Sequence, residues 1–128
     1  RHFVGVKRLT HETMYAPETK REAVAQSAYN IDIHSGVKDH IDLTPVAEPF
    51  GIPYGCLVPE SLNGLLLSGR TISVDTQVFA SARVMGPCIA VGEAAGTAAA
   101  MSVDKGIELR DVDVDALRAT LRENGNLF

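Results

Sequence analysis

The chain has 128 residues, of which 45 % are hydrophobic and 22 % are charged, and its formal net charge at pH 7 is −4. These fractions are those of an ordinary soluble globular protein, and the mildly acidic balance argues against nucleic acid or a membrane surface as the main partner. Cys56 and Cys88 are the only cysteines and are not in a paired spacing, so neither a disulfide scaffold nor a structural zinc site is expected. We therefore expect a cytoplasmic location.

The first third of the chain predicts two strands around a helix. Residues 3–6 form a short apolar run typical of a strand, and Thr10 followed by Thr13 indicates a helix start. Good helix formers over Lys20–Tyr29 predict a helix. Alternation over Asn30–Ser35 predicts a half-buried strand with its isoleucines on one side.

The middle of the chain predicts loops and two further strands. Residues 36–50 are expected to form a loop, and Gly51–Pro59, which is apolar between its prolines and glycines, an edge strand. The continuous apolar run Leu65–Leu67 favours a strand buried on both faces of a mostly parallel sheet. Polar side chains from Arg70 to Met85 then indicate a loop.

A long helix of small residues is predicted to start at Gly86-Pro87 and to stop at Gly106. One face of this helix would carry Cys88, Gly92, Ala95, Gly96, Ala99 and Val103. Glycine inside a helix costs roughly 1 kcal/mol relative to alanine, so a flat ligand or tight packing on a sheet is expected to offset it. A final amphipathic helix over Val112–Leu121 would be capped by Asp113 or Asp115.

Five side chains are candidates for chemistry. Asp32 could orient the imidazole of His34 for acid–base catalysis, although a polar strand face in water is the simpler interpretation. Arg70 and Arg83 bracket the polar loop and could hold an anion, or could be plain surface arginines. Cys88 is either a thiolate favoured by the helix start or, more simply, a buried inert thiol. The histidines show no metal-ligand spacing, so no metal site is expected.

Five motifs together resemble one family. They are Y-N-I-D-I-H at Tyr29–His34, F-G-I-P-Y-G-C-L-V-P at Phe50–Pro59, N-G-L-L-L-S-G-R-T-I-S at Asn63–Ser73, S-A-R-V-M-G-P-C-I-A-V-G-E-A-A-G-T-A-A-A at Ser81–Ala100, and V-D-V-D-A-L-R-A-T-L at Val112–Leu121. In this order and spacing they resemble the C-terminal part of the FAD-dependent oxidoreductases. These are two-domain flavoproteins related to the glutathione-reductase-like and succinate-dehydrogenase-like folds.

The resemblance implies an α/β (or α+β) fold in which residues 1–60 belong to the substrate domain and residues 61–128 to the FAD-binding domain. It implies that the long helix points its N-terminus at the flavin, where a reduced flavin carries negative charge. By resemblance, the residues lining the FAD would be Gly69, Arg70, Ser73, Arg83, Gly86 and Pro87. The catalytic candidates stay His34 and Asp32, which the residue pattern itself indicates.

The chain departs from the family pattern at two places. Family members often carry a histidine just after the equivalent of Ser73, where this chain has Asp75, Thr76 and Gln77. The glycine-rich βαβ unit that would hold the FAD pyrophosphate is also missing, and the chain begins at Arg1, so we expect a fragment that is inactive alone.

The expected function is therefore hydride or electron transfer from a small-molecule substrate to FAD in the parent protein. The expected partners are that substrate, the missing N-terminal half of the FAD-binding fold and, for the isolated piece, a second copy of itself. The alternative is a non-catalytic interaction or assembly module that keeps the fold without a cofactor.

Overall fold

The computed structural model describes residues 3–34 and 41–128. It is a mixed structure, 44 % helical and 16 % strand, which confirms the expected α/β or α+β class. The helices and strands are α1 (Pro17–Arg21), β1 (Ala23–Ser27), β2 (Ile31–His34), β3 (Ile41–Thr44), β4 (Phe50–Pro53), α2 (Thr76–Ala82), α3 (Met85–Lys105) and α4 (Val114–Glu123). Three short 3₁₀ turns join them: η1 (Tyr54–Cys56), η2 (Gly69–Thr71) and η3 (Leu109–Asp111).

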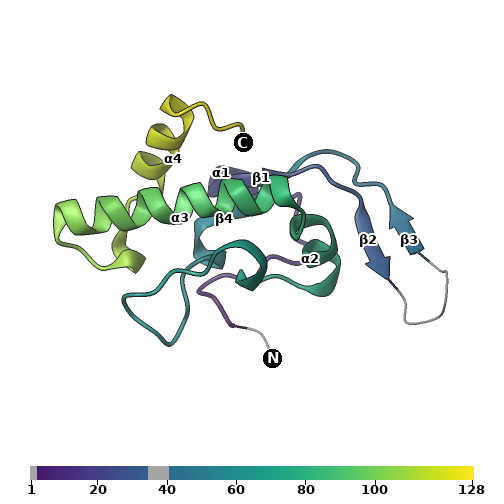
Figure 1. Ribbon diagram of the computed structural model, residues 1–128, viewed down its shortest axis with the longest axis horizontal. Coiled ribbons are helices and arrows are strands. Elements are labelled where there is room, and N and C mark those ends of the chain that lie inside the picture. The colour runs from purple at the N-terminus through teal and green to yellow at the C-terminus, as the bar shows by residue number, and fades with distance from the viewer. Residues whose placement is uncertain (1–2, 35–40) are drawn as a thin grey trace.

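The long helix α3 crosses the molecule, with β1 behind it and α4 against its C-terminal half (Figure 1). Its buried row is Pro87, Val91, Ala94, Ala98 and Ser102, a spacing of three and four residues that faces the core. The helix ends as predicted at Gly106, whose φ of 62° is the left-handed conformation that glycine adopts without strain.

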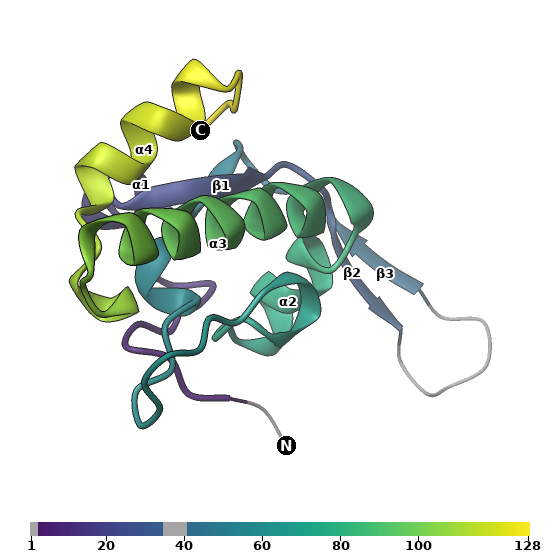
Figure 2. The same cartoon turned by 60° about the vertical axis from the view of Figure 1, so that its left-hand side comes forward.

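The strands form two separate antiparallel pairs. β1 pairs with β4, and β2 pairs with β3 in a hairpin that extends away from the body (Figure 2). The prediction of a mostly parallel sheet around a strand at Leu65–Leu67 is wrong, because this run has no ladder. Leu67 is buried and its N–H donates to the Leu57 carbonyl at 2.7 Å, whereas Leu65 is 41 % exposed.

The helix predicted over Lys20–Tyr29 is also wrong, because β1 occupies its centre. Val24 and Ala25 are consecutive and both buried, since one side of β1 meets α3 and the other meets the remaining core. Pairing with β4 supplies the backbone hydrogen bonds, so tertiary contacts override the helix propensity of the residues.

Two predicted loops contain regular structure. The helix α2 lies within the expected loop 70–85, and the Oδ1 of Asp75 caps it by accepting the Val78 N–H at 2.8 Å. β3 lies within the expected loop 36–50, of which residues 36–40 are outside the described part. The helix start expected at Thr10 is a turn, in which the Thr13 N–H donates to the Thr10 carbonyl.

Three other predictions are confirmed in whole or in part. β2 forms where the alternating pattern indicates a strand, and the predicted edge strand begins as β4 but ends at Pro53. α4 starts at the predicted cap, where the Oδ1 of Asp113 accepts the N–H groups of Asp115 and Ala116.

One hydrophobic core holds these elements together and takes residues from both halves of the chain. It includes Val24 and Phe50 from the strands, Val91 from α3, and Leu117 and Leu121 from α4. The division near residue 60 stays a prediction. No single helix of the described part is long and apolar enough to cross a membrane; α2 and α3 pass that test only as a pair, bent by 94° at the break between them.

Candidate functional site

Most of the predicted site residues gather around the corner between α2 and α3. Arg83 follows α2 directly, and the first turn of α3 contains Gly86 and Pro87. The 3₁₀ turn η2 brings Gly69 and Arg70 to α3, while β2 packs on α2. Figure 1 shows α2, the start of α3 and the base of the β2–β3 hairpin at the same end of the molecule.

The catalytic candidates on β2 contact each other and the corner. The His34 Nε2 lies 3.2 Å from the Asp32 Oδ2 and 3.1 Å from its Oδ1. Arg83 donates from Nη2 to the Asp32 carbonyl at 3.1 Å, and the same nitrogen lies 3.5 Å from the Asp32 Oδ2. Asp32 therefore lies between an imidazole and a guanidinium, where its carboxylate can orient both side chains.

Arg70 extends this set of contacts toward α3. Its Nε donates to the backbone carbonyl of Arg83 at 3.3 Å. Gly69 before it has a φ of 60°, a backbone conformation that glycine permits. Hydrogen bonds thus connect His34, Asp32, Arg83 and Arg70 around the start of α3.

The start of α3 is open and uncapped. Its N-cap residue Val84 offers no side-chain hydrogen bond, and the N–H groups of Met85 and Gly86 have no partner among the described residues. Met85 is 81 % exposed, and a Cβ added to Gly86 would meet nothing within 4 Å. Pro87, which has no N–H, is buried. A 21-residue helix that begins with free N–H donors and has Arg70 and Arg83 beside its start favours a negatively charged group at its N-terminus.

Ser73 lies apart from this corner and is buried in the interior of the protein. It is 1 % exposed, its N–H donates to the Cys56 carbonyl at 2.9 Å, and its carbonyl accepts the Leu9 N–H at 3.1 Å. Its hydroxyl has no hydrogen-bond partner in the described part of the chain. The backbone contacts make Ser73 a link between two buried segments.

A cavity of about 530 Å³ opens beside Arg70. Its lining includes Phe3, Arg8, Arg70, Ile72, Asp75 and Phe79. Of these residues, only Arg70 is a predicted site residue. Phe3, Arg8 and Phe79 look like ordinary strand or loop residues until the fold brings residues 3–8 next to α2. The one available signal was Asp75, because an aspartate can cap a helix that begins at the next residue.

The two thiols have different surroundings. Cys56 is fully buried, and burial raises the pKa of its thiol to about 12. Cys88 is half-buried in the first turn of α3, with its Sγ 3.7 Å from the Ala82 carbonyl oxygen. No three His, Cys, Asp or Glu side chains among the described residues lie close enough together to hold a metal ion.

The fold is thus a mixed helix–strand structure in which an uncapped helix N-terminus lies beside two arginines. Comparison with known families then gives a match to the family described as FAD dependent oxidoreductase over residues 1–121. The chain belongs to this family of flavin oxidoreductases, as its motifs predict. Comparisons with curated proteins and with solved structures give no significant match.

Proposed function

We propose that this chain forms the part of a flavin oxidoreductase that holds the flavin ring of FAD at the start of α3, where a small-molecule substrate is oxidised. The observation that carries this proposal is the uncapped N-terminus of α3 beside Arg70 and Arg83. When bound, FAD supplies the acceptor for a hydride or for electrons.

The residues of the corner fit a cofactor that becomes negative when it is reduced. The N–H groups of Met85 and Gly86 have no partner in the described part, and Gly86 leaves the space above them open. The guanidinium groups of Arg70 and Arg83 lie at the same end of the helix; that of Arg83 also contacts the Asp32 carboxylate, whereas that of Arg70 has no carboxylate partner among the described residues. Together they stabilise a developing anion at this position.

Asp32 and His34 are proposed to handle the substrate proton. The side chain of His34 is 57 % exposed, whereas that of Asp32 is 17 % exposed and contacts Arg83. The imidazole is thus accessible, and the carboxylate behind it is fixed in place. This arrangement suits a histidine that accepts or donates a proton while the aspartate orients its ring.

The outer face of α3 is proposed to contact the FAD-binding half of the fold that the family implies. Ile89 and Val103 on this face are 70 % and 80 % exposed, and Gly92 and Gly96 lie between them. Exposed apolar side chains in a row are typical of a surface that another protein segment covers. The same face would support self-association when the chain is isolated.

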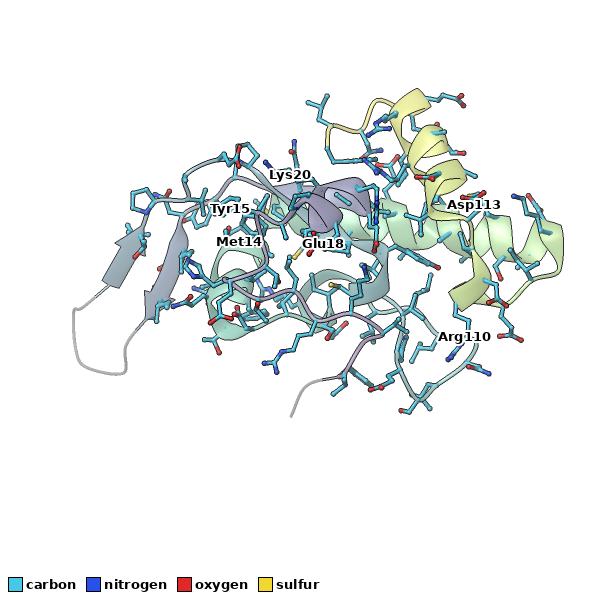
Figure 3. All side chains as sticks on the ribbon, turned by 180° about the vertical axis from the view of Figure 1, so that it is seen from behind. Met14, Tyr15, Glu18, Lys20, Arg110 and Asp113 are labelled. Atoms are coloured by element: carbon cyan, nitrogen blue, oxygen red, sulfur yellow. The ribbon has the colours of Figure 1, made fainter. Side chains whose placement is uncertain are left out.

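The test is the flavin content of the full-length protein. The purified protein is expected to show flavin absorbance, directly or after reconstitution with FAD. Arg83→Gln is expected to lower FAD retention or to make the reduction potential more negative, since it removes positive charge beside the reduced flavin. Arg110→Gln is the matched control, because Arg110 is exposed and lies on η3, at the opposite end of the molecule from α2 (Figure 3).

Two results would contradict the proposal. The first is a folded full-length protein that binds no flavin after reconstitution. The second is an Arg83→Gln variant whose flavin content and reduction potential both equal those of Arg110→Gln.

A further inference from the structure

We propose that the cavity beside Arg70 binds the carboxylate of a small molecule with a flat apolar body. The identification of this molecule as the substrate rests on the proposed function, whereas the binding itself depends only on the cavity. The proposal thus assigns a chemical class, the apolar monocarboxylic acids, to the ligand.

The charges of the lining match a single carboxylate. Arg8 and Arg70 bring two guanidinium groups, and Arg8 forms no ion pair within the part of the chain that the structure describes. Asp75 brings the one carboxylate of the lining, and its Oδ1 and Oδ2 already accept the N–H groups of Val78 and His11, each at 2.8 Å. One positive charge is left over, which complements a monoanion better than a doubly charged phosphate.

The remaining walls suit a flat apolar body. Phe3 and Phe79 contribute two aromatic rings, and Ile72 adds an aliphatic surface that is buried. Aromatic rings pack in offset or edge-on arrangements against other flat groups. The volume of about 530 Å³ is within the usual range for small-molecule sites, about 300–1,000 Å³.

Arg70 connects the cavity to the corner between α2 and α3. Its Nε is held by the Arg83 carbonyl, and its two terminal nitrogens have no hydrogen bond to any described residue. A guanidinium fixed at Nε presents its remaining N–H groups in a constant direction, which is suited to a carboxylate. A carboxylate bound by Arg70 would therefore lie next to the corner between α2 and α3, since the Arg70 Nε contacts the Arg83 carbonyl there.

The experiment is isothermal titration calorimetry of the full-length protein with matched acids and amides. The acids are benzoate, phenylacetate and indole-3-acetate, and the uncharged controls are benzamide, phenylacetamide and indole-3-acetamide. At least one acid is expected to bind, with its amide about tenfold weaker or worse, because the amide lacks the charge that pairs with guanidinium.

Variants at Arg8 test the geometry without changing the corner. Arg8→Gln is expected to weaken acid binding about tenfold or more, and Arg8→Lys to weaken it less because the charge is kept. Arg110→Gln, which does not line the cavity, is expected to bind like the unchanged protein. The flavin spectrum of every variant is recorded in parallel, so that loss of flavin and loss of acid binding are read separately.

The proposal is overturned if no acid binds to flavin-containing protein, if amides bind as well as acids, or if inorganic phosphate binds more tightly than every acid. It is also overturned if Arg8→Gln binds acids like Arg110→Gln. A flavin-free protein that still binds the acids through Arg8 supports the carboxylate site and contradicts only the proposed function.

Discussion

The buried hydroxyl pair Ser27–Ser81 offers a direct test of how the fold positions the corner between α2 and α3. Ser27, at the end of β1, is 1 % exposed and Ser81, on α2, is 0 % exposed. Their Oγ atoms lie 2.9 Å apart, and the Ser81 hydroxyl donates to the Tyr29 carbonyl just before β2. The pair therefore ties β1, β2 and α2 together two residues before Arg83.

The hydrogen bonds that each variant removes determine the expected loss of unfolding free energy. Ser81→Ala removes the donor to the Tyr29 carbonyl and one partner of Ser27, and is expected to lower the free energy of unfolding by about 1–3 kcal/mol. Ser27→Ala leaves the Ser81 hydroxyl with its bond to Tyr29, and about 1 kcal/mol is expected. The double variant should cost less than the sum of the two by roughly 0.5 kcal/mol or more, because the two hydroxyls are coupled.

Urea unfolding of the unchanged protein, both single variants and the double variant gives the cycle. Ser61→Ala is the control, since Ser61 is exposed and a change of about 0.5 kcal/mol or less is expected there. The reasoning is refuted if Ser81→Ala is no more destabilising than Ser61→Ala, or if the two single costs add without coupling.

Two further predictions concern the thiols and the outer face of α3. Iodoacetamide at neutral pH is expected to modify half-buried Cys88 well before Cys56, because burial raises the pKa of the Cys56 thiol to about 12. Mass spectrometry of the labelled peptides checks this order. Burial raises the pKa of Cys56 from 9.0 and that of Tyr54 from 10.0, each to about 12, so the unfolded state loses these protons first and stability should fall as pH rises from 9 toward 12. Equal labelling of both thiols in folded protein, or stability that is flat over this pH window, would contradict the burial argument. The isolated chain is expected to self-associate, which light scattering measures. Ile89→Glu is expected to reduce self-association more than Leu127→Glu, since both residues are exposed but only Ile89 lies on α3. A monomeric unchanged chain would contradict this prediction.

The sequence predicts the elements whose boundaries are set by local chemistry. Asp113 caps α4 because a side-chain oxygen can reach the first free N–H groups, and Gly106 ends α3 because a left-handed residue is required there. Both effects act over three or four residues and are visible in the chain itself. The alternation at Ile31–His34 is equally local, and β2 forms there.

The wrong secondary-structure predictions concern segments whose structure depends on contacts with residues far away in the sequence. Residues 23–27 prefer a helix locally, but β4 gives them a pairing edge and α3 covers them, so they form β1. Leu65–Leu67 looks like a buried strand, yet no neighbouring strand is present to pair with it in the described part. The cavity was missed for the same reason, because Phe3 and Arg8 reach α2 only through the fold.

The glycines of α3 have no close packing role among the residues that the structure describes. Each glycine inside a helix costs roughly 1 kcal/mol relative to alanine, and packing on the sheet was one explanation for this cost. The structure excludes that explanation: both Gly92 and Gly96 are exposed, a Cβ on Gly92 would meet only the Ser68 Oγ at 3.7 Å, and one on Gly96 nothing within 4 Å. Exposed glycines on a helix are expected where another molecule or protein segment approaches the helix backbone closely. The proposed function accounts for the open helix end, the glycines and the exposed Ile89 together, since it proposes a cofactor at the start of α3 and the rest of its binding fold along the outer face.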